Sequence, residues 1–197
     1  MDINKIKEKL ATPKETVVVE EVSYKQNYEN PLYAPIKKPA RDVMAAYQNA
    51  NRYLDAIKEQ LLINLHVPFF SHIIHELAHT MPQRFDKFGD ILHEHHLIIP
   101  YPATFEYLIA EDFTVEDCFG SIYDSLQEIE DNLLAFIKVT EGTRLHSMAC
   151  AAETLLQDIT KEYTWLRIIE AQFKSSNSLT SWDKWVHVYW ENKEHLI

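Results

Sequence analysis

Glycine is scarce in this chain: only Gly89, Gly120 and Gly142 occur in 197 residues. Tight hairpin turns depend on residues at positive φ, so an all-β sandwich with many such turns is not expected. Neither GxGxxG nor GxxxxGK[ST] occurs, so the common glycine-rich loops that bind phosphates are missing. The composition therefore argues against a β-sandwich and against the usual nucleotide-binding folds.

The chain also lacks an excess of positive charge. It has 30 acidic against 19 basic side chains, which gives a formal net charge of −11. The broadly basic surface of many nucleic-acid-binding proteins is therefore absent. An acidic surface keeps a protein soluble, which is the simpler interpretation, but inside a hollow assembly it could also attract cations.

Long apolar runs and cysteines are few. No apolar run reaches the length of a membrane span, and the N-terminus lacks the apolar segment of a signal peptide. The two cysteines, Cys118 and Cys150, fit a reducing compartment. We therefore expect a cytoplasmic protein that does not contact membranes.

What the chain does have is a helical pattern of apolar residues, which recur every three or four positions in four long segments. This pattern predicts an all-α fold. Pro82 should kink the second helix without ending it, because the period continues beyond it. The Thr114-x-x-Asp117 signal should cap the third helix, and Gly142 should end it in a left-handed conformation. The expected helices run from after Pro39 to about His66, over roughly 68–97, from Thr114 to Gly142 and over roughly 143–173.

The lengths of the links predict the topology. The first and third links are short, whereas residues 98–116 form a long crossing that could contain a short helix, TFEYLIAE. This order is typical of a ferritin-like four-helix bundle with one long crossover. We expect an N-terminal arm at 1–39 with a strand-like run at 17–22, the bundle at 40–173, and an aromatic C-terminal tail at 174–197. The tail should pack on the bundle or on a neighbouring subunit.

The most distinctive segment runs from His66 to His96 and holds seven of the ten histidines. Four of its side chains recur every seven residues: His72, His79, Asp86 and His93. Asp90 follows Asp86 by one helical turn. On a helix this spacing puts all five on nearly one face, which is either a solvated polar stripe or a metal site. The number of imidazoles beside two carboxylates favours a metal such as iron.

Three further segments have a characteristic order and spacing. FDKFGDIL (85–92) places two carboxylates one turn apart, and YPATFEYLIAE (101–111) lies in the long crossing. TLLQDITKEYTWLRIIEAQ (154–172) has an acidic and basic run before Trp and Leu. Together they resemble the Dps family, the DNA-binding proteins from starved cells, within the ferritin-like superfamily. The resemblance covers about residues 41–173.

The resemblance implies a homo-oligomer, namely a spherical dodecamer. Such a particle oxidises Fe(II), typically with hydrogen peroxide, and stores Fe(III) mineral inside. The ferroxidase site would lie between two-fold-related subunits. His66 and His72 would bind iron from one subunit, and Asp86 and Asp90 from the other. DNA binding has weak support, because acidic residues nearly balance the lysines of the arm.

The sequence departs from the family's pattern at this site. Val67 stands where the family has Trp, Asp90 replaces a Glu, and the link between His66 and His72 is shorter. The spacing from His72 to Asp86 is also one residue shorter, which rotates His72 by about 100° on a helix. The alternative hypothesis is therefore a Dps-like shell, or a DNA-associating protein, whose ferroxidase site has degenerated.

The same segment permits two other metal sites. His75-Glu-Leu-Ala-His79 is an HExxH pattern, in which two histidines bind zinc and Glu76 acts as the general base of a metalloprotease. No third zinc ligand is evident downstream. Glu76-x-x-His79 is also a ligand pair of di-iron bundles. With Glu59 and a carboxylate of the third helix, such as Glu128 or Glu130, it could form a site within one subunit.

Overall fold

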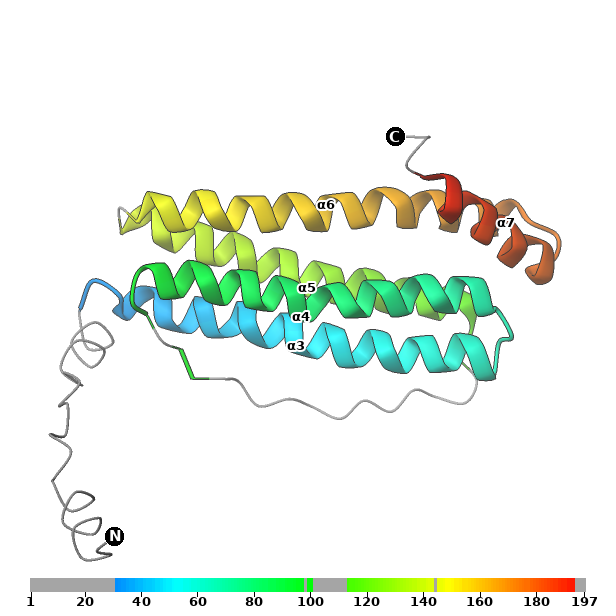
Figure 1. The fold of residues 1–197 in the computed structure, drawn as a ribbon, viewed down its shortest axis with the longest axis horizontal. Coiled ribbons are helices and arrows are strands. Elements are labelled where there is room, and N and C mark those ends of the chain that lie inside the picture. Colours follow the sequence, from blue (N-terminus) through cyan, green and yellow to red (C-terminus); the bar gives the residue numbers. More distant parts are fainter. Residues whose placement is uncertain (1–30, 98, 101–112, 144, 194–197) are drawn as a thin grey trace, which may run out of the picture.

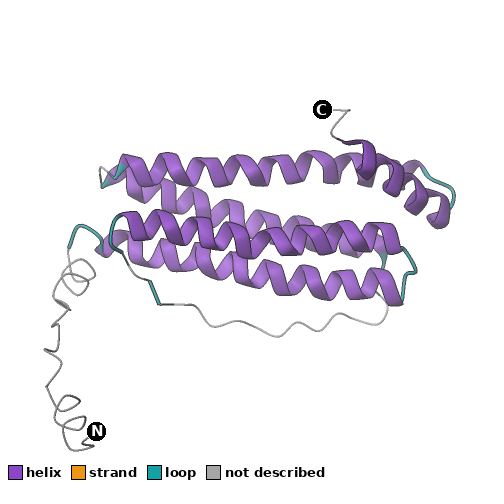
Figure 2. Ribbon diagram, viewed as in Figure 1, coloured by secondary structure: helices purple, strands orange, loops and turns teal. Residues whose placement is uncertain are grey.

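The computed structural model describes residues 31–97, 99–100, 113–143 and 145–193. These residues form α-helices and contain no β-strand, so the expected all-α fold is confirmed for them (Figure 2). No helix among them is long and apolar enough to cross a membrane. The helices are α3 (Ala34–Ile63), α4 (Pro68–Glu94), α5 (Val115–Gly142), α6 (His146–Ser175) and α7 (Leu179–Asn192).

The four long helices, α3 to α6, lie side by side (Figure 1). Phe70 and Phe119, near the starts of α4 and α5, have ring centroids 5.0 Å apart, and Phe88 and Phe136 lie 4.9 Å apart further along. α4 and α5 therefore run in the same direction, and α3 and α6 run in the opposite one. Both α3 and α6 pack against α4 and α5. The end of α4 and the start of α5 therefore lie at opposite ends of these helices.

The long helices hold together through apolar stripes that face one another. Residues three or four positions apart on each helix are buried, as the amphipathic pattern of the sequence predicts. Each large apolar side chain that becomes buried stabilises the fold by about 1.5–3 kcal/mol. Fully buried members of this core include Leu54, Ile57, Ile73, Phe88, Ile122, Phe136, Ile159 and Ile169.

α3 begins earlier than the sequence predicted. It starts at Ala34, so the end of the expected arm is helical and Pro39 lies inside the helix. Pro35 lies in the first turn, where a missing N–H costs nothing because that donor has no partner within the helix. Pro39 removes one hydrogen bond, but Ile36 and Ala40 are fully buried beside it. Burial of these side chains offsets the lost bond.

Pro82 lies inside α4 and does not end it, as expected. The predicted cap of α5 is also confirmed: Asp117 N–H donates to Thr114 Oγ1 at 3.2 Å, and Asp117 Oδ2 accepts from Thr114 N–H at 2.9 Å. The hydrogen bonds that Asp117 Oδ2 accepts from the Thr114 hydroxyl, at 2.6 Å, and from Thr114 N–H lower the pKa of Asp117. The prediction that Gly142 ends α5 in a left-handed conformation is wrong, since no glycine in the described ranges has a positive φ. Instead, Thr143 N–H donates to Val139 O at 3.1 Å where the helix ends.

The aromatic tail contains a helix that the sequence did not predict. Ser178 caps α7, because its Oγ accepts from Ser181 N–H at 3.4 Å. Trp182 is only 1% exposed, and its indole N–H donates to Ile169 O at 3.1 Å. Its ring packs against Phe70, Phe119 and Phe173. The tail therefore packs on the helices of its own chain.

Two predicted elements lie outside the described residues: the strand-like run at 17–22 and the short helix TFEYLIAE in the crossing. Cys118 and Cys150 are free thiols near the starts of α5 and α6. Since these helices run in opposite directions, the two thiols lie at opposite ends of the four long helices.

Candidate metal centre

α7 fixes the start of α4, the helix that carries the histidine-rich segment. Asp183 accepts hydrogen bonds from the backbone N–H groups of Phe70 at 2.8 Å and Phe69 at 3.2 Å. Donors in the first turn of a helix lack partners within it, and a carboxylate there also interacts favourably with the helix dipole. Burial raises the pKa of Asp183, while the two N–H groups oppose that rise. α4 has no acidic residue in its own first turn, so α7 supplies the cap.

One turn further along α4, two histidines lie beside a carboxylate of α3. His75 Nδ1 is 3.4 Å from Asp55 Oδ1, and His75 Nε2 is 3.2 Å from His79 Nε2. The two imidazole rings are nearly perpendicular, with centroids 4.3 Å apart. Both side chains are accessible, since His79 is exposed and the His75 side chain is 39% exposed. Asp55 was not among the candidate residues that the sequence suggested.

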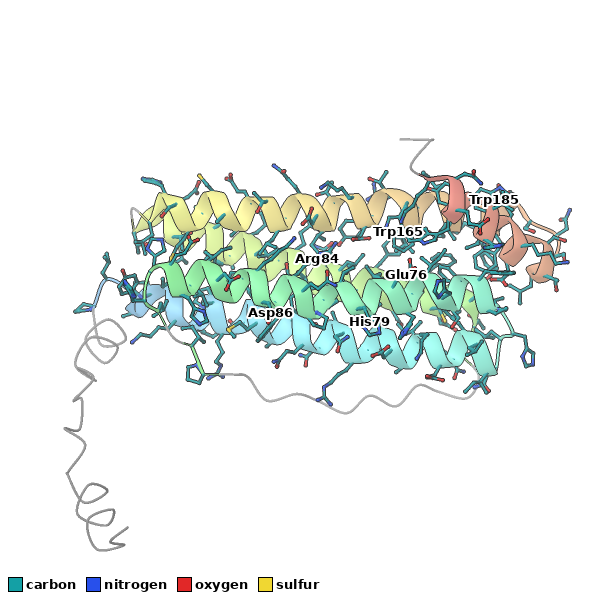
Figure 3. The ribbon with its side chains drawn as sticks, viewed as in Figure 1. Glu76, His79, Arg84, Asp86, Trp165 and Trp185 are labelled. Carbon is teal, nitrogen blue, oxygen red and sulfur yellow. The ribbon has the colours of Figure 1, made fainter. Side chains whose placement is uncertain are left out.

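Glu76, the acid of the HExxH pattern, is directed toward α7. Its Oε2 accepts from Trp190 Nε1 at 2.8 Å, and its Oε1 lies 3.3 Å from His72 Nε2. The Trp190 ring in turn packs edge-on against Trp165 at 5.0 Å. Figure 3 shows Glu76 on the side of α4 nearer α7 and His79 on the side nearer α3. Glu76 is therefore held away from the position of a general base between the two histidines.

The second half of α4 carries the carboxylates predicted to bind iron. Asp86 and Asp90 are exposed, and neither forms a hydrogen bond or ion pair with another described residue. Together with His93 they line a cavity of about 180 Å³. Met44, Phe85 and Leu92 form part of its apolar wall. Two carboxylates and an imidazole thus lie at the rim of an open, partly apolar hollow.

The two predicted histidine ligands lie near the other end of α4. His66 is exposed in the link between α3 and α4, where its backbone has a φ of 54°. His72 is also exposed, with 66% of its side chain accessible. Fourteen residues of α-helix separate His72 from Asp86, which corresponds to about 21 Å along the axis. The predicted histidine pair and carboxylate pair therefore do not meet within one subunit.

The alternative site within one subunit is not assembled either. In the described ranges, no group of three or more His, Cys, Asp or Glu side chains is arranged to hold a metal ion. Glu59 is exposed and paired with Lys58 at 2.7 Å. Glu128 lies on α5, which runs diagonally opposite α4, so it does not complete a set with Glu76 and His79.

A buried polar contact between α4 and α6 was missed by the sequence reasoning. Arg84 is 7% exposed and pairs with Glu162, which also accepts from the indole N–H of Trp165. The second terminal nitrogen of Arg84, Nη1, is buried without a partner among the described residues. A charged residue beside the apolar stripe of α4 is the only signal in the sequence that could have indicated it. This pair links α4 to α6.

The comparison with models of protein families finds none that matches this chain. The comparison with curated protein sequences finds no match either.

Proposed function

We propose that the chain is a ferritin-like, Dps-type protein that binds and oxidises Fe(II) and stores the product in a shell of identical subunits. Iron is the substrate and the cargo. The ferroxidase site would form across a two-fold axis, with His66 and His72 from one subunit and Asp86 and Asp90 from its partner. The observation that carries the proposal is that Asp86 and Asp90 of α4 are exposed and form no ion pair with another described residue.

The path of the long helices supports the ferritin-like part of the proposal. α3 and α4 are antiparallel, as are α5 and α6, while α4 and α5 run in the same direction. A connection across the full length of the helices is needed between α4 and α5. A four-helix bundle with one long crossover of this kind is the ferritin-like arrangement.

The position of the donors supports a site between subunits. Asp86 and Asp90 face solvent without partners in the described part of the chain, and His72 lies about four turns away on the same helix. A two-fold axis near the middle of α4 would bring the start of one α4 helix beside the end of the other. In a two-fold symmetric interface, a residue near the start of one α4 helix contacts a residue near the end of the partner's α4 helix, and the reverse contact forms as well.

The donor set fits the chemistry of iron. Carboxylate oxygens and imidazole nitrogens are both ligands for iron, and a site open to solvent leaves positions for an oxidant. In the reaction, two Fe(II) ions each give one electron to hydrogen peroxide, which takes up two protons and leaves as two water molecules. The carboxylates would stabilise the Fe(III) that forms, because its charge is higher.

Fe(II) oxidation by purified protein tests the proposal. The wild-type chain should accelerate formation of the ferric product after addition of peroxide, and the double variant Asp86→Asn/Asp90→Asn should lose that acceleration. Glu153→Gln, which removes an exposed acid from α6, is the matched control and should oxidise iron like the wild type. If wild type and the double variant oxidise Fe(II) at the same rate, the proposed ligands are wrong.

The size of the particle separates this proposal from the alternative. A shell of ferritin-like size that takes up no iron would favour the degenerate site indicated by Val67 and Asp90. A monomer in solution would contradict both forms of the proposal, because each requires an assembled shell. DNA association stays a prediction, since the lysine-containing arm lies outside the described residues.

A further inference from the structure

The pair His75 and His79 on α4 has no role in the proposed iron site. We propose that these two imidazoles bind a first-row divalent transition-metal ion within a single subunit, with Asp55 of α3 as the positioning residue. This site is distinct from the proposed ferroxidase site, because it uses neither Asp86 nor Asp90 and needs no second copy of the chain.

The separation of the two ring nitrogens carries the inference. His75 Nε2 and His79 Nε2 lie 3.2 Å apart. Two imidazole nitrogens bound to one ion at about 2.0–2.1 Å, with an angle of about 90–110° between the bonds, would be about 2.9–3.4 Å apart. The pair therefore already has the spacing of two ligands on one ion. The i, i+4 spacing on α4 places both rings on one side of the helix.

Asp55 determines which nitrogen of His75 faces His79. Its Oδ1 lies 3.4 Å from His75 Nδ1, so the proton belongs on Nδ1 and the lone pair on Nε2. Metal-binding histidines commonly donate their other ring N–H to a carboxylate in this way. The lone pair on His75 Nε2 then needs either an N–H from His79 or an ion shared with it. An experiment can separate these two states.

The surroundings decide the class of ion. The described residues contain no group of three or more candidate ligands, so water would fill the remaining positions. Glu76 is engaged by Trp190 and His72 instead. Two imidazoles favour borderline ions over Ca²⁺ and Mg²⁺, which prefer oxygen ligands. Affinity should rise from Mn²⁺ through Co²⁺ and Ni²⁺ to Cu²⁺ and fall again at Zn²⁺.

A calorimetric titration of the tag-free, full-length chain with NiCl₂ tests the inference. The variant His79→Gln should bind Ni²⁺ at least about tenfold more weakly than the wild type, because the chelate is lost. Asp55→Asn should weaken binding by about tenfold, the typical effect of removing a carboxylate that orients a ligand. His146→Gln, which removes an exposed histidine from α6, is the matched control and should leave the affinity unchanged.

The spectrum of bound Cu²⁺ provides an independent readout. Electron paramagnetic resonance should detect two coupled imidazole nitrogens in the wild type and one in His79→Gln. The Asp86→Asn/Asp90→Asn variant should bind Ni²⁺ like the wild type, which keeps this result independent of the iron site. Equal Ni²⁺ affinity in wild type and His79→Gln, or one coupled nitrogen in the wild type, would overturn the inference. The 3.2 Å contact would then be a hydrogen bond between imidazoles.

Discussion

The two halves of α4 differ in where their polar groups find partners. In the first half, Asp183 caps the helix, Trp190 donates to Glu76, and Asp55 contacts His75. In the second half, Asp86 and Asp90 have no partner among the described residues. The polar groups of the first half are bound by α3 and α7 of the same chain, whereas the exposed carboxylates of the second half remain open to another molecule.

This difference separates two kinds of polar residue that look alike in the sequence. Histidines and carboxylates occur throughout the segment from His66 to His96 at similar helical spacing. Asp183 and Trp190 of α7 and Asp55 of α3 bind groups in the first half of α4, and His95 beyond its end contacts Ser147, whereas Asp86 and Asp90 have no partner among the described residues. Changes to Trp182 and Asp183, which hold α7 on the first half, should therefore alter stability, whereas changes to Asp86 and Asp90 should alter binding and leave stability unchanged.

The largest effect on stability should come from the side chain that anchors α7. Trp182→Ala removes a ring that is 1% exposed and packed among three phenylalanines, so it should cost about 3–5 kcal/mol. Val188→Ala changes a residue on the same helix that is 57% exposed, and it should cost less than about 0.5 kcal/mol. Urea unfolding curves of both variants would measure the contrast. Equal losses would show that α7 does not stabilise α4 through its buried face.

The cap on α4 should have a smaller effect. Asp183→Ala leaves the N–H groups of Phe69 and Phe70 without their acceptor, so we expect a loss of about 1–2 kcal/mol. Hydrogen exchange should become faster at these two amides, while the amides around Asp90 keep the wild-type rate. Unchanged exchange at Phe69 and Phe70 would mean that Asp183 does not cap the helix in solution.

Tyr47 of α3, which packs near the middle of α4, should affect stability mainly at high pH. Its hydroxyl is buried without a partner among the described residues, and burial raises the pKa of Tyr47 above its usual value of 10.0. The folded chain holds this proton more tightly than the unfolded chain, so the contribution of Tyr47 to stability is constant below pH 10 and falls as the pH rises further. Tyr47→Phe should reduce that fall.

At neutral pH, Tyr47→Phe should keep stability within about 1 kcal/mol of the wild type, because the hydroxyl forms no hydrogen bond with a described residue that could be lost. Tyr123 and Tyr163 also have raised pKa values from burial, so part of the alkaline loss should remain. Thermal unfolding at pH 7 and above pH 10 measures both effects. An equal alkaline loss in variant and wild type would contradict this account of Tyr47.

The smallest effect on stability should come from the second half of α4. Asp86→Asn/Asp90→Asn removes exposed carboxylates without partners in the described ranges, so the free energy of unfolding should change by less than about 0.5 kcal/mol. The same variant should lose Fe(II) oxidation. A loss of several kcal/mol would mean that these carboxylates have a structural role within the subunit.

The sequence predicted those features that depend on local patterns. The apolar period predicted four long helices, and Thr114 with Asp117 predicted the start of α5. It missed features in which distant residues decide the outcome: burial of Ile36 extends α3 through Pro39, and Trp182 packing on Phe70 makes α7 part of the fold. The partners of the histidines were missed for the same reason. Asp55 and Trp190 reach α4 from other helices, and no local pattern indicates their contacts.

Mixed particles made from two inactive variants test the central claim most directly. His66→Gln/His72→Gln lacks the proposed histidine ligands, and Asp86→Asn/Asp90→Asn lacks the carboxylates. If the site lies across a two-fold axis, random co-assembly restores it wherever intact histidines face intact carboxylates, which is about one quarter of the sites. Co-expressed variants should therefore recover about a quarter of the wild-type rate of Fe(II) oxidation. No recovery in particles shown to contain both variants would contradict a site shared between subunits.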